Sequence, residues 1–290
     1  MISIIGVVAV VGAGVMGGDV AATAAFHGYK VIVKDVDPEA LAKAPHIIRQ
    51  NIRKYKMISQ DLQNWNISDI LSRITFSDSY EGFEQASWII ENTTEDVEVK
   101  SAVFRELCEV CSSNVRFAVN TSCITITQLA GLVPQPERVI GMHFMNPVPL
   151  KGIVETIRGF HTSDETIEAS EAFLRSLGKT SVLVQDSPGF VSNRLSHLFM
   201  NEAAFLVQEQ VAEPEQIDTL FKQGYGHKMG PLETADLIGL DTVVRSLDVL
   251  YQNYQDPKFR CCPLLKKMVD AGLKGRKSGR GFYTYNERGI

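Results

Sequence analysis

A glycine-rich turn between a short apolar strand and a helix constrains the fold of this chain more than any other feature. The run from Val7 to Val11 is apolar and mostly β-branched, and residues 12–17 read GAGVMG. A helical stretch follows from about residue 15 to 27, Gly28 supplies a stop, and a second short strand ends near Asp35. Strand, glycine turn, helix, strand and acid in this order predict a parallel βαβ unit that binds a dinucleotide.

Each part of this unit has a physical role. Gly12 permits the tight turn, Gly14 lets a pyrophosphate approach the backbone, and Gly17 lets the helix pack close to the strand. The helix N-terminus presents unpaired N–H groups to the anion, so no lysine is needed beneath it. Asp35 can accept hydrogen bonds from ribose hydroxyls and would repel a 2′-phosphate, which favours NAD over NADP. Asp19, near the same helix start, is expected to face solvent, because it would otherwise compete with the pyrophosphate.

The first eighteen residues carry no charge, which raises the possibility of an export or membrane segment. A secretory signal needs basic residues before its apolar stretch, yet the first basic residue is Lys30, and four glycines interrupt a spanning helix. We therefore expect no membrane segment and a cytoplasmic protein. The five scattered cysteines agree with a reducing compartment.

The remaining chain indicates two domains. Strand-like and helical segments alternate up to a strand at about residues 181–185, which predicts a doubly wound, Rossmann-type, mostly parallel sheet with antiparallel strands near its end. After Asp186 the apolar residues recur at helical spacing, and a strand is expected only at residues 282–285. We predict an α/β domain over residues 1–186 that binds NAD, followed by a smaller all-α domain over 187–290 that forms the substrate cleft. Its apolar positions, expected to support a homodimer, include Leu237, Ile238, Val243, Leu247 and Leu250.

Charge and motif content exclude other classes of ligand. A net charge of −5 argues against general nucleic-acid binding, which needs clustered Lys and Arg. No HxH or HExxH pattern is present, and the Cys108/Cys111 pair has no second pair to complete a zinc site, so no metal is expected.

Polar residues that follow predicted strands are candidates for the chemistry, because ligands of open α/β sheets bind beyond the carboxyl ends of the strands. His143 lies at such an end, and Glu155 follows twelve residues later, enough for a turn and a returning strand. A carboxylate beside the imidazole would fix its tautomer and leave the other nitrogen to act as a general base, with Ser122 bonded to the substrate oxygen. The alternative is a strand-end histidine that bonds only to backbone.

Seven segments occur in an order and spacing that together are highly specific: GAGVMG at 12–17, Glu95 with Lys100, NTS at 120–122, HFMNPVPLKGIVE at 143–155, SPGFVSNR at 187–194, GPLETADLIGLDT at 230–242 and KSGRGFYTY at 277–285. With them the chain resembles the 3-hydroxyacyl-CoA dehydrogenase family, including the short 3-hydroxybutyryl-CoA dehydrogenases, over essentially its whole length.

The resemblance implies roles for individual residues. His143 would be the catalytic base that Glu155 orients, and Ser122 and Asn193 would contact the substrate. Asn193 could also be the N-terminal polar residue of the long helix, a role that can coexist with substrate contact, and Lys100 could equally be a solvated helix residue. The implied contacts of NAD are Gly12, Gly14, Val15, Met16, Gly17, Asp35, Glu95, Lys100, Asn120, Ser122 and Asn146.

The chain departs from the family on the helix after Asp35. The family often has Ser and then Lys there to hold coenzyme A, whereas this chain has Asn51 and Ile58. Residues 40–60 nevertheless carry five basic residues and no acid, which is either a solvated helix face or a site for an anionic carrier. We take Asn51, Arg53 and Lys54 as candidate contacts for the phosphates of CoA or for an acyl carrier protein.

The leading hypothesis is an NAD-dependent oxidoreductase that interconverts a short-chain 3-hydroxyacyl thioester and its 3-oxoacyl counterpart, as in fatty acid metabolism. The first alternative keeps the chemistry but uses an acyl group on an acyl carrier protein, as in polyketide extender-unit biosynthesis. Two further alternatives are a β-hydroxyacid dehydrogenase, against which the His143/Glu155 pair argues because that class uses a lysine base, and a non-catalytic structural protein that binds NAD.

Overall fold

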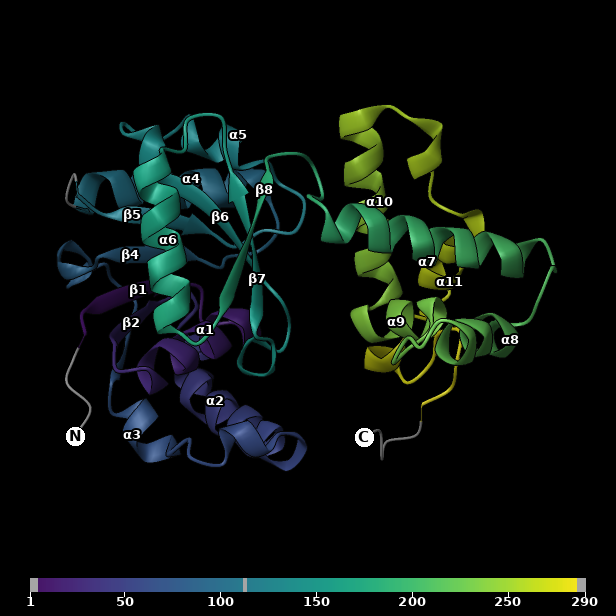
Figure 1. Ribbon diagram of the computed structural model, residues 1–290, viewed down its shortest axis with the longest axis horizontal. Helices are drawn as coiled ribbons and strands as arrows, with labels where there is room; N and C mark the ends of the chain where they lie inside the picture. Colours follow the sequence, from purple (N-terminus) through teal and green to yellow (C-terminus); the bar gives the residue numbers. More distant parts are fainter. Residues whose placement is uncertain (1–4, 112–113, 286–290) are drawn as a thin grey trace. The chain divides into compact units, whose positions relative to one another are not determined.

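The computed structural model describes residues 5–111 and 114–285, and the chain divides into two compact units, residues 1–187 and 188–290. The first unit contains an eight-stranded sheet in the order β3-β2-β1-β4-β5-β6-β7-β8 (Figure 1). All neighbouring strands pair in parallel except β6 and β7, which are antiparallel. The strands are β1 Val7–Val11, β2 Lys30–Lys34, β3 Ile74–Ser77, β4 Trp88–Glu91, β5 Arg116–Val119, β6 Val139–Phe144, β7 Ile153–Arg158 and β8 Thr180–Gln185. This confirms the predicted doubly wound fold.

Helices cover both faces of this sheet, with α1 and α6 on one face and α4 and α5 on the other (Figure 1). Their sequences contain the expected start signals: the side chain of Asp37 caps α2 and that of Asp96 caps α4. The helices of this unit are α1 Val15–Phe26, α2 Pro38–Ile58, α3 Ile67–Leu71, α4 Val97–Val110, α5 Ile126–Ala130 and α6 Asp164–Ser176.

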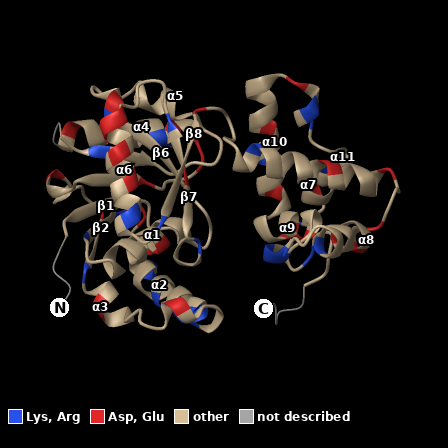
Figure 2. Cartoon of the chain, in the orientation of Figure 1, with Lys and Arg blue, Asp and Glu red and all other residues tan. Residues whose placement is uncertain are grey.

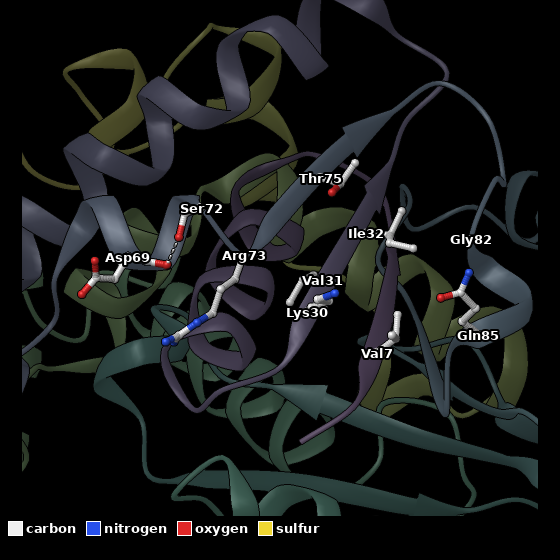
Figure 3. A pocket seen from close by; sticks show the side chains of 10 residues that line it. All are labelled: Val7, Lys30, Val31, Ile32, Asp69, Ser72, Arg73, Thr75, Gly82 and Gln85. Atoms are coloured by element: carbon white, nitrogen blue, oxygen red, sulfur yellow. Dashed lines mark hydrogen bonds between the residues drawn. The ribbon is translucent and has the colours of Figure 1, made fainter. Parts of the chain in front are cut away.

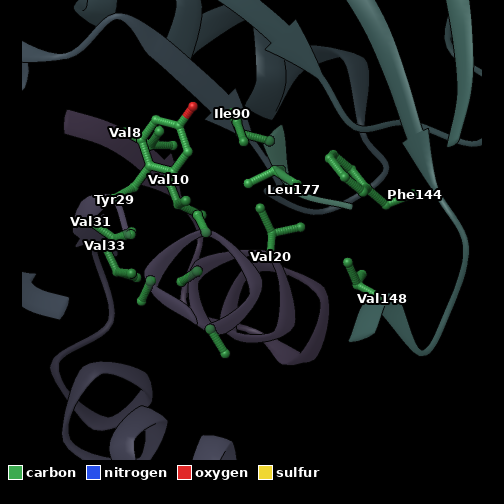
Figure 4. Packing of buried hydrophobic residues seen from close by; sticks show 14 of the residues in the cluster. Val8, Val10, Val20, Tyr29, Val31, Val33, Ile90, Phe144, Val148 and Leu177 are labelled. Atoms are coloured by element: carbon green, nitrogen blue, oxygen red, sulfur yellow. The ribbon is translucent and has the colours of Figure 1, made fainter. Parts of the chain in front are cut away.

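The alternation of side chains along the strands produces two cores. Val8 and Val10 of β1 point toward α1, where they pack with Val20 and Ile90 (Figure 4). Both faces of the central strands are buried, which explains why β1 and β4 are almost wholly apolar.

The second unit is helical, as predicted. It contains α7 Ser192–Gln208, α8 Pro214–Thr219, α9 Pro231–Ile238, α10 Leu240–Tyr254 and α11 Pro263–Asp270. Among the apolar residues expected to support a dimer, Val243, Leu247 and Leu250 are buried within this unit, whereas Leu237 and Ile238 remain exposed. Val243, Leu247 and Leu250 therefore belong to the core of the unit and offer no surface for a dimer.

The strand expected at residues 282–285 is not formed. Within residues 275–285 only isolated bridges occur, between Gly275 and Arg280 and between Arg280 and Thr284. The backbone amides of Phe282 and Tyr283 instead donate to the buried carboxylate of Asp236, at 3.1 and 3.0 Å. A carboxylate thus replaces a partner strand, which the alternation of residues 282–285 could not indicate.

Two buried carboxylates hold this tail against the helices. Asp236 also accepts from the Tyr285 hydroxyl at 3.0 Å, and Asp218 accepts from the Tyr283 hydroxyl at 2.8 Å. Asp218 additionally accepts the backbone amides of Leu232 and Glu233 at the start of α9. Tyr283 therefore joins both carboxylates. No described helix is long and apolar enough to cross a membrane.

We predict that Asp236→Ala destabilises the second unit by about 2–3 kcal/mol, because three partly buried donors lose their acceptor. Urea unfolding followed by far-UV circular dichroism measures the effect. Tryptophan fluorescence serves as an internal reference, since Trp65 and Trp88 both lie in the first unit. The exposed Asp270→Ala is the matched control. A circular dichroism midpoint equal to that of the control would contradict the assignment.

Candidate active site

The order of the strands reverses between β1 and β4, and a cavity of about 500 Å³ opens beyond their carboxyl ends. Ligands of doubly wound sheets bind at this switch point. The wall of the cavity combines the glycine turn with the segments that follow β2 and β4: Val11, Gly12, Gly14, Lys34, Asp35, Val36, Asn92, Thr93, Thr94, Val99, Ala102, Val103 and Glu106.

The glycine turn has the geometry that a dinucleotide needs. Gly12 has φ +105°, and a Cβ there would lie 2.7 Å from the carbonyl oxygen of Asn92. A Cβ on Gly17 would lie 1.9 Å from the carbonyl oxygen of Gly12, so only glycine lets α1 pack this closely. The space at Gly14 is open to 4 Å, and no side chain caps the first turn of α1. The turn therefore leaves both room and N–H donors for a pyrophosphate.

Asp35 follows β2 and lines the same cavity. Its carboxylate accepts the Ala13 amide at 2.7 Å and the Asp37 amide at 3.0 Å, which ties the second strand to the glycine turn. A carboxylate oxygen can accept more than one hydrogen bond, so Asp35 retains capacity for ribose hydroxyls. The adjacent Val36 is 79% exposed and offers no cation for a 2′-phosphate. These residues fit NAD.

A buried ion pair lies beneath the turns after β4 and β5. Lys100 is fully buried, and its Nζ donates to Glu91 Oε2 at 2.6 Å, to the Asn120 carbonyl at 3.1 Å and to the Thr93 carbonyl at 3.3 Å. Glu91 Oε1 in turn accepts the amide and the hydroxyl of Thr93. The alternative of a solvated helix lysine is therefore wrong. Sequence reasoning missed Glu91, although its place at the end of a predicted strand was a usable signal.

Glu95 organises the turn after β5. One carboxylate oxygen accepts the Thr121 hydroxyl at 2.7 Å and the amides of Cys123 at 2.8 Å and Ser122 at 2.9 Å. The side chain of Glu95 comes from the loop after β4, so it connects the loops of two neighbouring strands. Ser122 is thereby held at a fixed place beside the end of β6.

His143 and Glu155 lie directly opposite each other in the antiparallel β6–β7 pair. His143 Nδ1 is 3.1 Å from Glu155 Oε2, and Nε2 is 3.4 Å from Ser122 Oγ. Both side chains are nearly buried, at 8% and 5% exposure for the two residues. The direct register explains why a separation of twelve residues brings them together.

Asn120 and Asn146, two of the predicted contacts of NAD, lie in different surroundings. Asn120 Nδ2 donates to Asn92 Oδ1 at 2.6 Å, and Asn120 Oδ1 accepts the Phe144 amide at 3.2 Å, so this side chain joins the ends of β4, β5 and β6. Asn146 is exposed and precedes Pro147 through a cis peptide bond.

Asn193 belongs to the second unit, where it is the second residue of α7. Its backbone carbonyl accepts from Ser196 Oγ at 3.4 Å and lies 2.8 Å from His197 Nδ1. The residue at the helix N-cap is Val191, and Asn193 is a polar residue in the first turn of this long helix, as the alternative proposed.

The middle of α2 is arranged differently from expectation. Asp19 is 2% exposed, so the prediction that it faces solvent is wrong: its carboxylate accepts from Tyr55 Oη at 2.8 Å and from Asn51 Nδ2 at 3.4 Å. Asn51 therefore points inward, while Arg53 and Lys54 are exposed on α2. Figure 2 shows the basic residues of this helix in blue among uncharged residues in tan.

A further cavity, of about 810 Å³, lies at the opposite edge of the sheet, beside the first residues of β1 and β2 (Figure 3). Val7, Lys30 and Arg73 are among its lining residues, and the glycine turn and the His143–Glu155 pair are not. We therefore place the chemistry at the carboxyl edge. Among the described residues, no cluster of three or more potential metal ligands occurs.

Comparison with known proteins agrees with this geometry. Residues 7–187 match the 3-hydroxyacyl-CoA dehydrogenase NAD binding domain, and residues 189–285 match the C-terminal domain of the same family.

Individual relatives resemble the chain over almost its whole length. It is 43% identical to a probable 3-hydroxybutyryl-CoA dehydrogenase of Bacillus subtilis, covering 96% of this chain and 97% of that protein. It is 42% identical to the 3-hydroxybutyryl-CoA dehydrogenase of Bradyrhizobium diazoefficiens, covering 98% and 97%. The crystal structure of (S)-3-hydroxybutyryl-CoA dehydrogenase from Ralstonia eutropha superposes with a TM-score of 0.88 at 39% identity, covering 97% and 99%. The chain therefore belongs to the 3-hydroxyacyl-CoA dehydrogenase family and is an NAD-dependent dehydrogenase.

Proposed function

We propose that this enzyme interconverts a short-chain 3-hydroxyacyl thioester and the corresponding 3-oxoacyl thioester, with His143 as the general base. The observation that carries the proposal is the His143–Glu155 pair beside Ser122, at the edge of the sheet where the cofactor cavity opens. Relatives at 42–43% identity whose names specify 3-hydroxybutyryl-CoA support a short acyl group. The polar Asn92, Thr93 and Thr94 in the cavity wall agree with a small or hydroxylated acyl group.

Each member of the pair would have its own task in the proposed reaction. With Nδ1–H donating to Glu155, the Nε2 lone pair of His143 is available to take the proton of the substrate hydroxyl. Glu155 then stabilises the imidazolium, and in the reverse direction His143 returns the proton to the 3-oxo oxygen. Bound NAD would supply the acceptor for the hydride that leaves the carbon bearing this hydroxyl. Ser122 would hold the substrate oxygen in place.

The remaining polar groups would bind and orient the cofactor. The turn at residues 12–17, including Val15 and Met16, would receive the pyrophosphate, and Asp35 the ribose. We assign Asn120, Asn146 and Glu95 to the nicotinamide end. Lys100 would act there through the carbonyls of Thr93 and Asn120 that its ammonium holds.

A second candidate function keeps the reaction but uses an acyl group on an acyl carrier protein, as polyketide extender-unit biosynthesis requires. The observation that favours it lies on α2, where Asn51 is turned toward Asp19 instead of outward. The exposed surface beside it combines Arg53 and Lys54 with Met57 and Ile58, which are 87% and 73% exposed. A basic surface with exposed apolar residues suits an acidic carrier domain.

We also propose that the chain forms a homodimer through its second unit. Leu195, Leu220 and Tyr225 are 64%, 66% and 75% exposed there, which is unusual for large apolar side chains unless a partner covers them. Cys108, Cys111, Cys261 and Cys262 are free thiols, which supports our expectation of a cytoplasmic protein.

His143→Gln should lower kcat by at least ~10²-fold while NADH binding is retained, because the variant loses its general base but keeps the cofactor cavity. Turnover of 3-hydroxybutyryl-CoA followed by NADH absorbance, with NADH binding followed by fluorescence, measures both effects. His161→Gln, at an exposed position, is the control. Unchanged turnover would remove His143 from the mechanism, and wild-type protein without turnover on any acyl thioester would favour a structural role.

Turnover of the same acyl group, presented once on CoA and once on an acyl carrier protein, identifies the carrier that the enzyme uses. If the carrier protein is the physiological partner, the double variant Arg53→Glu/Lys54→Glu should raise KM for the protein-bound substrate at least ~10-fold through charge repulsion and leave kcat unchanged. The exposed pair Lys30→Glu/Lys267→Glu controls for net charge. A strong preference for CoA that the Arg53/Lys54 variant does not alter would eliminate the second candidate.

The homodimer should be evident in light scattering as a particle of twice the chain mass. Leu195→Glu with Leu220→Glu should shift it to monomer, because charges would then be buried in the interface. Wild-type protein that is monomeric at assay concentrations would refute the proposed dimer.

A further inference from the structure

Two charged side chains are buried in the first unit away from the His143–Glu155 pair. Asp19 in α1 is 2% exposed, and Lys179, just before β8, is 7% exposed. Neither has a role in the proton transfer described above. Because the burial of charge is costly, such groups call for an explanation.

Lys179 holds the turn that connects β6 to β7. Its Nζ donates to the carbonyl of Val148 at 2.7 Å and to the carbonyl of Lys151 at 2.8 Å. These carbonyls flank the 3-10 turn η4, Val148–Leu150. Burial lowers the pKa of Lys179 to about 8, whereas the negative charge of Asp19 favours its protonated form.

Asp19 lies on α1, which packs against the same turn. Burial raises the pKa of its carboxyl group, whereas the hydrogen bonds from Tyr55 and Asn51 and the nearby backbone amide of Val148 favour the ionised form. The peptide groups on the two sides of Val148 thus meet an anion at the N–H and a cation at the carbonyl. The side chain of Val148 lies in the core near Val20 and Phe144 (Figure 4).

The turn that these charges hold is the loop of the hairpin bearing both members of the pair. His143 is the second-to-last residue of β6, and Glu155 is the third residue of β7. The exposed Asn146 lies in the loop itself. An apolar pair of similar volume would stabilise a core at least as well as buried charges, so stability alone does not account for them. Opposite charges beside the two peptide groups that flank Val148 do fix the directions of those groups.

We propose that Asp19 and Lys179 form an electrostatic clamp on the Val148 turn and are positioning residues for the reaction. The clamp keeps the loop after β6 in the place where Asn146 can meet the cofactor and where His143 and Glu155 stay in register. The inference about the reaction rests on the proposed function, whereas the clamp itself does not.

The test compares wild-type protein with Asp19→Asn/Lys179→Met, which removes both charges and leaves no buried ion unpaired. Hydrogen exchange measured by mass spectrometry should be at least ~5-fold faster for amides of residues 148–152 and unchanged for β1 and α1, with global protection kept. On 3-hydroxybutyryl-CoA, kcat should fall at least ~10-fold with KM for the thioester altered less than ~3-fold, as a misplaced base predicts. Lys30→Met, at an exposed position, is the control.

Asp19→Asn alone keeps the side-chain volume, so it tests the same point with smaller effects should the double variant fail to fold. Exchange at 148–152 equal to wild type in a folded variant would overturn the clamp. Faster exchange with unchanged kcat would overturn its positioning role. Faster exchange in a protein whose wild type turns over no acyl thioester would leave the clamp standing and refute the proposed function.

Discussion

The approach of Gly12 to the carbonyl of Asn92 is the contact on which the rest of the site depends. The carbonyl lies where a side chain would begin, so β1 and β4 can end side by side only if residue 12 is glycine. That approach opens the crevice at the switch point, and the equally close packing of Gly17 on Gly12 directs the N-terminus of α1 into it. Backbone N–H groups then replace basic side chains as the anion site, which is why an uncharged stretch can bind a charged cofactor.

Around this crevice, charged side chains hold the turns that follow the strands. Glu91 and Lys100 fix the turns after β4 and β5, and Glu95 fixes the start of the next segment through three donors on one oxygen. Turns of this kind carry backbone groups that no strand or helix satisfies. A buried ion satisfies several of them at once, and its hydrogen bonds are stronger than those of neutral groups. These stronger hydrogen bonds offset the cost of desolvating the ion, and they hold the loop in one geometry.

The sequence allowed the strands to be predicted well because their signal is local. The apolar run at residues 7–11 and the βαβ spacing hold without any knowledge of tertiary contacts, and the direct pairing of His143 with Glu155 needs only a turn between two strands. The same reasoning does not predict buried charges. Asp19 accepts a hydrogen bond from Tyr55, which is 36 residues away in the chain, and an aspartate at a helix start is usually solvated. The prediction of a strand at residues 282–285 was wrong for a related reason. The backbone amides of this segment donate to Asp236, which lies about 46 residues earlier in the chain.

The proposed chemistry and the proposed carrier surface lie on different elements of the first unit. Proton transfer is assigned to the β6–β7 hairpin, whereas the exposed cations lie on α2. Asp19 connects the two regions, because it bonds to Tyr55 and Asn51 of α2 and lies against the turn of the hairpin. The inward side of α2 is thereby tied to Asp19, whereas Arg53 and Lys54 on its outward side are exposed. If the proposed carrier surface is correct, substitutions on the outward side alone would change the carrier and leave the reaction itself intact.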